Sequence, residues 1–539
     1  MELSWSNKRF SSLCPGPRSG SSPSVLAGGL PDPEHAPGRG LATKPVLQSA
    51  WLRATGRRAS AALLLLVLSS CGGRGAVNVV LISLDTLRAD RLNCYGYRAR
   101  VVSPNIDALA RDGVLFEAHI AAAPWTTPSH MSLLTSLYPT SHGVTASIRS
   151  IKQVIQGASP GEYERLNSSR TTLAEVFAGK GFATAAFTGG GGVDPQIGFG
   201  RGFSVYDTSM VKLDSRDMRT MYSWIDGQKD RPFFIFWHTY EVHAPYFETT
   251  FLADVLPRSK AAEIEGAYQR LPRERESPRA VQILKDFGAF DPVVSDALYT
   301  GGVRAVDRWV GEFIGFLKTR GLYERTLIVL TSDHGEQLGE RALDAGDWCS
   351  FYDCHGHTLF DELVRVPLIV KLPSEQHAGT RMRSVSSALD VMPTILDVVR
   401  LSGPTTQMQG VSLRARWEGR AQGSPSFAYS ESLAGDTEAK SVRSEHLKYT
   451  LRIRADTVSQ YGRAFIPLTP DKRELYDLEA DPGERRNLLS SSAAQSYARL
   501  AAMLDAALRR QTAGRVGHAE GQTLAKETMD RLRSLGYIR

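Results

Sequence analysis

The sequence of 539 residues has little net charge once its first part is set aside. The formal charge is +7, but residues 1–70 hold eight Lys and Arg against three Asp and Glu, so the rest carries only about +2. Nucleic-acid binding depends on concentrated positive charge, and we therefore predict no nucleic-acid partner. Long hydrophobic runs are also missing. The apolar run Ala59–Leu68 is too short to span a bilayer as a normal helix, and no internal repeat is visible.

The composition of the first 75 residues predicts a leader rather than a folded unit. Residues 1–50 are rich in Gly, Pro and Ser without periodicity, which is typical of disorder. Arginines between 53 and 58 then precede the apolar run, as in a secretory signal peptide. Residues 68–71, Leu-Ser-Ser-Cys, also resemble a bacterial lipobox, in which Cys71 is lipidated. We expect an exported protein anchored through Cys71 to a membrane on the periplasmic side, with a plain signal peptide as the alternative.

Cysteine is scarce, with five in the whole chain. Cys94 stands alone, whereas Cys349 and Cys354 are close together. An oxidising compartment permits a bridge between the close pair. The alternative is a zinc site that combines the pair with His355 and His357.

From residue 76 onward the chain alternates apolar strands with helical segments. The strands are unbroken apolar runs, which is typical of parallel strands covered on both faces. They lie at 77–85, 183–187, 232–237, 326–331 and 366–372, and helices are expected at 104–113, 128–137, 297–320 and 387–401. This order predicts an α/β domain over 76–403 with a doubly wound, mainly parallel central sheet flanked by helices. Shorter, more polar strands over 404–539 predict a smaller C-terminal α+β subdomain.

Two of the predicted strands end in acidic residues. Asp85 ends the first, and Asp333 with His334 follows a later one. Ligands of open α/β sheets bind at the carboxyl ends of strands, and two carboxylates with an imidazole can hold a divalent cation. The alternative is that the aspartates are caps and that the histidines lie on the surface.

Two hydroxyl groups precede the helix expected at 128–137. Thr126 and Thr127 stand where a side chain commonly caps a helix N-terminus, and capping is one interpretation of both. The other is that the helix N-terminus, with its free N–H groups, faces a bound oxyanion. A glycine run at 189–192 lacks the Lys of a P-loop, so we expect a plain flexible loop there.

Several motifs occur together in one order along the chain. Each is weak alone, but the ordered set resembles the sulfatase family of the alkaline phosphatase superfamily from Val77 to the C-terminus. The motifs are ISLDTLRAD at 82–90, TTPSH at 126–130, HAPY at 243–246, SDHGE at 332–336, DELVRVP at 361–367 and ELYDL at 474–478.

The resemblance implies a role for each motif residue. Thr126 falls at the position of the family nucleophile, and His243 matches a histidine that contacts the anionic group or the leaving oxygen. The implied metal ligands are Asp85, Asp333, His334 and Thr126, with Ca²⁺ as the first expectation and Mg²⁺, Mn²⁺ or Zn²⁺ as alternatives. The implied substrate-binding residues are His130, His238, His355 and His357, with the choice between the last two left open.

The chain departs from the family pattern at the nucleophile. Sulfatases normally carry Cys or Ser there, which is oxidised to formylglycine, so Thr126 predicts no formylglycine. His130 replaces an Arg, Thr86 replaces a second Asp, and glycines replace a Lys-x-His segment. A sulfated Thr has no elimination route and needs water to attack it, whereas a metal-activated Thr is a sound nucleophile for phosphoryl transfer.

These features lead to one predicted function and two alternatives. The prediction is a metal-dependent hydrolase of sulfate esters. The first alternative is a phosphodiesterase or phosphotransferase that uses Thr126, and the second is a non-catalytic binding protein of the same fold. The first two imply an anionic sulfate or phosphate ester as the substrate.

Overall fold

The computed structural model describes most of the chain from Val77 onward. The described residues are 77–145, 162–228, 231–269, 291–341, 355–421, 427–433, 438–454, 472–492, parts of 494–506, and 520–523. The leader with Cys71 and the pair Cys349 and Cys354 lie outside them. Within them, Cys94 is a free cysteine.

The large sheet has nine strands in the order β10-β2-β8-β7-β1-β6-β4-β5, with β9 paired to β2. All pairs are parallel except those that β8 makes with β2 and β7. The strands are β1 (Asn78–Leu84), β2 (Val114–Ile120), β4 (Ala183–Phe187), β5 (Val205–Asp207), β6 (Phe233–Thr239), β7 (Thr326–Thr331), β8 (Arg365–Lys371), β9 (Thr380–Met382) and β10 (Ser386–Ser387). The prediction of a mainly parallel central sheet is confirmed.

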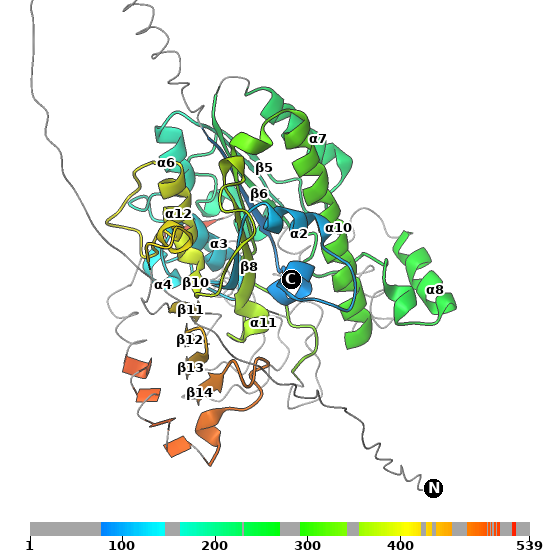
Figure 1. Ribbon diagram of the computed structural model, residues 1–539, viewed down its shortest axis with the longest axis vertical. Coiled ribbons are helices and arrows are strands. Elements are labelled where there is room, and N and C mark those ends of the chain that lie inside the picture. Colours follow the sequence, from blue (N-terminus) through cyan, green and yellow to red (C-terminus); the bar gives the residue numbers. More distant parts are fainter. Residues whose placement is uncertain are drawn as a thin grey trace, which may run out of the picture. The chain divides into compact units, whose positions relative to one another are not determined.

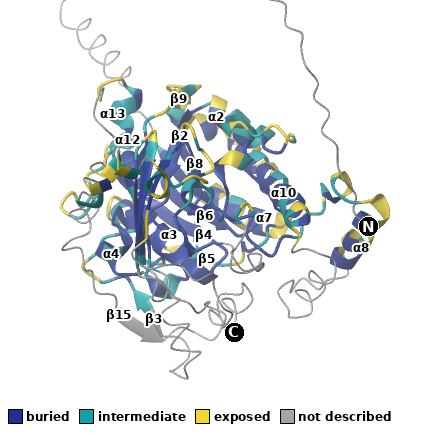
Figure 2. Ribbon diagram, turned by 90° about the horizontal axis from the view of Figure 1, so that it is seen from below, coloured by how far each residue is buried: buried dark blue, intermediate teal, exposed yellow. Residues whose placement is uncertain are grey.

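Helices cover both faces of this sheet, as Figures 1 and 2 show. Every residue of β1 is buried, and its side chains alternate between two hydrophobic cores: Val79 and Leu81 enter one, Val80 and Ile82 the other. The first core is closed by α3 (Thr126–Thr135), α6 (Leu173–Gly179) and α12 (Val391–Val398), and the second by α2 (Pro104–Arg111), α7 (Ser215–Asp226) and α10 (Pro292–Thr319). Burial on both faces explains why the strand is apolar without alternation.

A second sheet follows in the C-terminal part. It is antiparallel and consists of β11 (Ala428–Ser432), β12 (Glu438–Arg443), β13 (Leu447–Arg454) and β14 (Lys472–Asp477). The expectation of a smaller C-terminal unit with its own strands is confirmed. A further strand, β15 (Glu520–Thr523), pairs with β3 (Glu162–Arg165). No strand was expected from the sequence at 162–165, and the partner of this strand is supplied by residues 520–523.

The second sheet is bonded to the segment that leads into α3. Ser430 Oγ donates to the Ala121 carbonyl oxygen at 2.6 Å, and the Glu431 N–H donates to the Ala122 carbonyl oxygen at 2.8 Å. Ser432 Oγ donates to the Gly356 carbonyl oxygen at 2.9 Å. The C-terminal strands therefore hold two segments that border the carboxyl edge of the large sheet.

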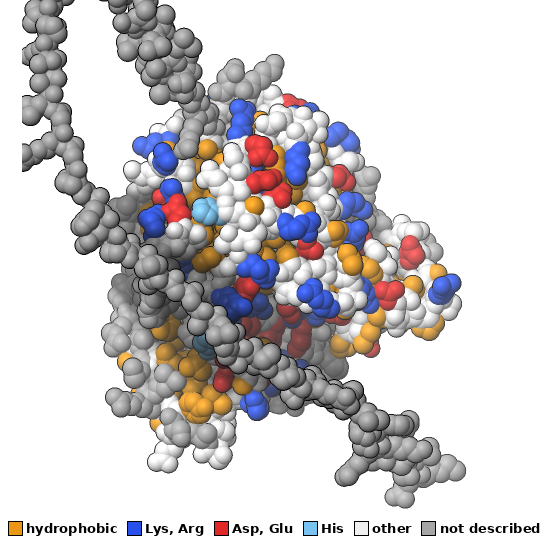
Figure 3. Space-filling model, viewed as in Figure 1, with side chains coloured by type: hydrophobic (Ala, Val, Ile, Leu, Met, Phe, Trp, Pro, Cys, Tyr) orange, Lys and Arg blue, Asp and Glu red, His pale blue; other side chains and the backbone are white. Residues whose placement is uncertain are grey.

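The remaining helices are shorter or lie farther from that edge. They are α4 (Pro139–His142), α8 (Arg258–Gln269), α11 (Asp361–Val364) and α13 (Arg414–Trp417). None of the helices in the described part of the chain is long and apolar enough to cross a membrane. Figure 3 shows basic and acidic side chains interspersed over the face seen there.

Candidate functional site

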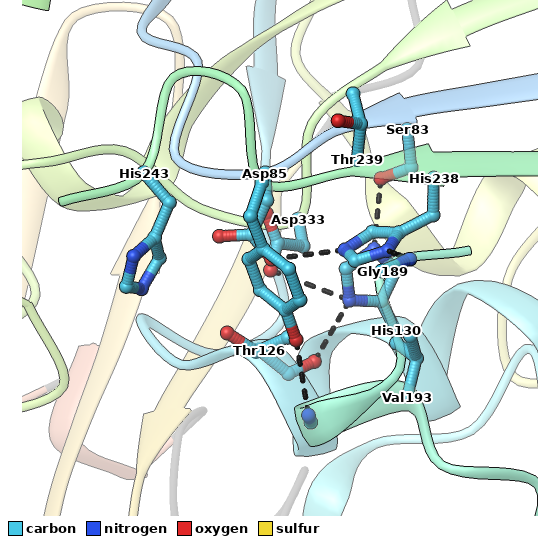
Figure 4. A network of polar contacts seen from close by, with 12 residues as sticks. Ser83, Asp85, Thr126, His130, Gly189, Val193, His238, Thr239, His243 and Asp333 are labelled. Carbon is cyan, nitrogen blue, oxygen red and sulfur yellow. Dashed lines mark hydrogen bonds and ion pairs between the residues drawn. The ribbon is translucent and has the colours of Figure 1, made fainter. Parts of the chain in front are cut away.

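Adjacent strands bring the two predicted aspartates to one edge of the sheet. β1 lies between β6 and β7, so Ser83 pairs with His238 on one side and with Thr331 on the other. Asp85 directly follows β1, Asp333 comes two residues after the end of β7, and both carboxylates are buried (Figure 4). The carboxyl ends of the strands thus meet where ligands bind in open α/β sheets.

Helix α3 begins at the same place, at Thr126. Its N-cap is Trp125, which makes no side-chain capping bond, so the interpretation of the two threonines as caps is wrong. Thr127 Oγ1 instead donates to the Gly192 carbonyl oxygen at 2.8 Å, and Thr126 Oγ1 lies 3.2 Å from His334 Nε2. The Thr126 hydroxyl therefore stands beside a predicted metal ligand, at a helix end whose dipole favours anions.

The predicted metal ligands form a compact group. One ligand atom from each of Asp85, Asp333 and His334 lies within 4.8 Å of the others. Asp85 Oδ1 and Asp333 Oδ2 are buried without a hydrogen-bond partner among the described residues. Two imidazole nitrogens, His130 Nδ1 and His334 Nε2, approach Asp333 Oδ2 to 3.3 and 3.2 Å but lack hydrogen-bond geometry.

The electrostatics of this group fit a cation. Burial, and then the charge of Asp333, raise the pKa of the Asp85 carboxyl well above its ordinary value. Burial alone would also raise the pKa of Asp333, but the imidazoles of His334 and its neighbours lower it. A divalent cation would satisfy the two bare oxygens and relieve the repulsion between the carboxylates. The residues present thus fit a metal site.

A second group, Asp85 with His130 and His238, meets the same distance criterion. The Gly189 N–H donates to His238 Nδ1 at 3.2 Å, so His238 Nε2 carries the hydrogen and donates to Asp85 Oδ2 at 3.2 Å. Protein groups therefore engage both nitrogens of this ring, which leaves neither for a metal.

His130 is engaged in the same way. Its Nδ1 lies 3.0 Å from the Thr126 carbonyl oxygen, which can only accept, and its Nε2 lies 2.9 Å from Ser83 Oγ. Burial lowers the pKa of both His130 and His238. The second group is a support for the first, with neutral imidazoles that hold Asp85 and the start of α3 (Figure 4).

Three further histidines were predicted to contact substrate. Burial lowers the pKa of His243 to about 3, and its ring centroid lies 5.1 Å from that of His355. The His355 ring also lies 4.5 Å from that of His334 and 5.2 Å from that of Trp125. His357 Nε2 contacts Gln337 Oε1 at 3.1 Å instead. Of the two open candidates, His355 is the one placed among the site residues.

The glycine run forms a wall of the site rather than a separate loop. Gly189 to Val193 are buried. A Cβ on Gly192 would stand 2.8 Å from Thr126 Cγ2, closer than side chains tolerate. Tyr240 Oη bridges this run, donating to the Gly190 carbonyl oxygen at 2.9 Å and accepting the Gly192 N–H at 3.0 Å.

Sequence reasoning missed three residues of the site. Glu336 is buried, and its Oε1 lies 2.8 Å from His355 Nδ1. Tyr240 was not singled out, although it lies three residues before the HAPY motif. Lys212 Nζ donates to the backbone carbonyls of Tyr240 and His243 at 2.5 and 2.8 Å. Glu336 stands in the SDHGE motif, which was a usable signal, but nothing local marks Lys212.

Comparisons with known proteins identify the relatives of this chain. Residues 77–401 match the family model Sulfatase, and residues 346–513 match N-sulphoglucosamine sulphohydrolase, C-terminal. A multifunctional alkaline phosphatase superfamily protein, PehA of Trinickia caryophylli, is 24% identical over 77% of this chain and 92% of its own length. Steryl-sulfatase of Rattus norvegicus is 25% identical over 61% of this chain and 68% of its own length.

Solved structures share the fold. One, described as BT4656 in complex with D-glucosamine-2-N,6-O-disulfate, has a TM-score of 0.61 at 18% identity and covers 81% of this chain and 98% of its own. The phosphonate monoester hydrolase of Agrobacterium radiobacter has a TM-score of 0.56 at 22% identity, covering 83% and 97%. The Sulfatase match spans more than half of the chain and every strand of the nine-stranded sheet. The chain is a member of the sulfatase family, in the alkaline phosphatase superfamily.

Proposed function

We propose that the chain is a divalent-metal-dependent hydrolase of sulfate esters whose nucleophile is the Thr126 hydroxyl. The observation that carries the proposal is the pair of buried carboxylate oxygens without partners, Asp85 Oδ1 and Asp333 Oδ2, beside that hydroxyl. Membership of the sulfatase family favours the sulfate ester, and relatives named as sulfatases point the same way.

In this proposal Asp85, Asp333, His334 and Thr126 hold the metal, with Ca²⁺ first by family resemblance. A bound divalent cation would supply positive charge and lower the pKa of the Thr126 hydroxyl. In the proposed step Thr126 Oγ1 attacks sulfur in line and the bond between sulfur and the leaving oxygen breaks. The sulfuryl group is thereby transferred to Thr126, which then carries a sulfate ester. The N-terminus of α3 offers backbone N–H groups to the oxygens that gain charge.

The histidines around Thr126 have different roles in this proposal. His243, neutral through burial, takes up the proton that the Thr126 hydroxyl loses and passes it to the leaving oxygen. His355 lies on the same side, next to His243. His130 and His238 act on the substrate indirectly, because their nitrogens hold protein groups rather than face a ligand.

A second candidate function is hydrolysis or transfer of phosphodiesters. Threonine cannot become formylglycine, and a Thr ester of phosphate is a normal covalent intermediate. The neutral imidazole of His130 in place of an Arg does not separate the two functions, because a sulfate monoester and a phosphodiester each carry one negative charge. The structural similarity to phosphonate monoester hydrolases shows that this fold also accommodates phosphorus esters in other proteins.

A non-catalytic binder is the third candidate. The missing Arg and Lys-x-His favour it, whereas the carboxylates retained at Asp85 and Asp333 speak against it. A binder would have no need of two buried oxygens without partners.

One experiment separates the three candidates. The protein is loaded with Ca²⁺, Mg²⁺, Mn²⁺ or Zn²⁺ and assayed on an aryl sulfate, an aryl phosphate and a bis-aryl phosphate. Each assay is repeated with Thr126→Ala and with Thr126→Ser, which keeps a hydroxyl. We expect turnover in the parent and in Thr126→Ser only. Unchanged turnover in Thr126→Ala would disprove the nucleophile, and a parent without turnover or bound metal would favour the binder.

We also propose export and anchoring through Cys71, with a leader over 1–75, a catalytic domain over 76–403 and a C-terminal subdomain over 404–539. The lipobox-like residues 68–71 support the anchor. Expression in a bacterium that processes lipoproteins should place the protein in the membrane fraction. Cys71→Ala should release it, and retention of that variant in the membrane would contradict the anchor.

A further inference from the structure

The proposed function does not name the group that catalyses hydrolysis of the Thr126 ester. An ester on Thr126 cannot leave by elimination, because threonine has no second hydroxyl on the carbon that bears the ester. Water must attack it, and that attack needs a base to take the proton. The inference below supplies this base and therefore rests on the proposed function.

We propose that His355, oriented by Glu336, is the base that activates water against the Thr126 ester. Glu336 Oε1 lies 2.8 Å from His355 Nδ1, and both side chains are buried. A carboxylate can only accept, so Nδ1 donates and the ring carries its lone pair on Nε2. This is the arrangement in which a carboxylate fixes the tautomer of a catalytic imidazole.

The position of His355 places that ring beside the nucleophile. Its ring lies 4.5 Å, centroid to centroid, from that of His334, whose Nε2 is 3.2 Å from Thr126 Oγ1. It also contacts the ring of Trp125, the residue before Thr126, at 5.2 Å. The base candidate thus packs against the two residues that flank the Thr126 hydroxyl in space and in sequence.

The backbone at the next residue fixes this placement from the other side. Gly356 has a φ of +90°, and a Cβ there would stand 2.7 Å from Trp125 Cε3. Its carbonyl oxygen accepts the hydroxyl of Ser432, in β11, at 2.9 Å. His355 is therefore held by Glu336 at its ring and by the C-terminal sheet at its backbone.

The neighbouring histidine pairs with an amide instead of a carboxylate. His357 contacts an amide, Gln337 Oε1, at 3.1 Å. Gln337 and Glu336 are adjacent in sequence, yet only the carboxylate is paired with the histidine that packs on His334. An amide offers no charge to stabilise an imidazolium, so Gln337 provides a natural control for Glu336.

The step balances without any added reactant besides water. The water oxygen forms a bond to sulfur or phosphorus while its proton passes to His355 Nε2. The bond to Thr126 Oγ breaks, and its electron pair returns to that oxygen. The proton on His355 then reprotonates the threonine or leaves with product, and Glu336 keeps its charge throughout. Glu336 is a positioning residue, and His355 is the catalytic one.

The test measures the two half-reactions separately. Metal-loaded full-length protein is mixed with 4-nitrophenyl sulfate and, in a second series, with bis(4-nitrophenyl) phosphate. Glu336→Leu, Glu336→Gln and His355→Asn are compared with Gln337→Leu. Nitrophenolate release reports formation of the Thr126 ester, and intact-protein mass reports its accumulation.

We expect a burst of one nitrophenolate per site in Glu336→Leu and His355→Asn, followed by turnover about 100-fold slower than in the parent. The ester should accumulate on Thr126 in these variants and not in Gln337→Leu. Glu336→Gln, which keeps an acceptor but loses the charge, should fall between. Metal content should match the parent, which separates a role in positioning a base from a role in folding or metal binding.

Three results would overturn the inference. One is a steady rate without burst or ester in Glu336→Leu, and another is equal accumulation in Gln337→Leu. The third is loss of metal from Glu336→Leu, which would indicate that Glu336 and His355 are metal ligands. None of these results contradicts the proposed function. That function fails if Thr126→Ala still turns over, if the parent shows neither turnover nor bound metal, or if no ester forms on Thr126 in any variant.

Discussion

Two groups of side chains at the carboxyl edge of the sheet look alike by distance and differ in chemistry. Asp85 belongs to both. With Asp333 and His334 it forms a group that leaves two carboxylate oxygens without partners among the described residues. With His130 and His238 it forms a group whose four ring nitrogens all contact protein atoms. Hydrogen bonding, rather than proximity, distinguishes a metal site from its support.

The contacts of His130, which stands where the resemblance implies an Arg, explain its place in the second group. His130 cannot supply a permanent charge, but it reaches both Ser83 in β1 and the first carbonyl of α3. It therefore ties the strand that ends in Asp85 to the helix that begins at Thr126. His130 is therefore a neutral brace between β1 and the start of α3.

Asp333→Asn should produce the largest effect, since it removes a metal-facing carboxylate from the first group. We expect no bound metal and a loss of kcat/KM of at least about 1,000-fold, equivalent to several kcal/mol of charge stabilisation. Metal content after gel filtration and turnover of an aryl sulfate or bis-aryl phosphate measure the two effects. If Asp333→Asn still bound a full complement of metal, the first group would not be the metal site, and the distinction between the two groups would be wrong.

Gly192→Ala should come next, because the glycine run lies between the second group and the nucleophile. The added methyl would meet Thr126 Cγ2 at 2.8 Å and displace the hydroxyl. A misplacement of this size lowers kcat by about 100-fold while metal stays bound. Thr126→Ser removes the clashing Cγ2, so the double variant Gly192→Ala/Thr126→Ser should be more active than Gly192→Ala alone. If it is not, the loss has another cause.

His238→Phe should have a smaller effect, confined to metal affinity. The ring shape remains, but the Nε2–H that donates to Asp85 Oδ2 is lost. Loss of such a supporting bond weakens metal binding by about 10- to 100-fold. Titration calorimetry on parent and variant measures the change. A complete loss of binding, as in Asp333→Asn, would show that His238 is itself a ligand.

His119 extends the comparison to a buried histidine far from the metal group. Burial lowers its pKa to about 3, and its Nδ1 contacts Ser386 Oγ at 2.9 Å. Below the ordinary histidine pKa of about 6.5, His119 is protonated in the unfolded chain but stays neutral in the folded chain. The free energy of unfolding therefore falls by about 1.4 kcal/mol for each unit by which the pH is lowered. His119→Asn should reduce this slope between pH 6 and about 5 in urea titrations. An unchanged slope in His119→Asn would contradict the assignment.

Much of the fold followed from local pattern. The unbroken apolar run at 77–85 predicted a central strand, and burial of every β1 residue explains why that pattern is reliable. The strand β3 was missed because its partner β15 is supplied from near the other end of the chain. No local window contains both partners, so no periodicity could indicate the pair.

The site, like the fold, was predictable where local sequence carries the signal and not where packing decides. Asp85 and Asp333 could be predicted because both follow strands, and Thr126 because it opens a helix beside a recognisable motif. The capping interpretation of the threonines failed since it assumed that the nearest backbone is the preferred partner. In the folded chain Thr127 reaches Gly192 and Thr126 reaches His334, which are near only through packing.

The sequence by itself determined the family, the sheet and the identity of the groups that could hold a metal. These depend on residue type, apolar runs and the order of motifs, all of which are properties of the chain. Only the tertiary structure decided which histidines support the metal group and which lie on the substrate side in the proposed mechanism. That choice depends on where each ring nitrogen finds its hydrogen-bond partner, and those partners come from strands and loops brought together by folding.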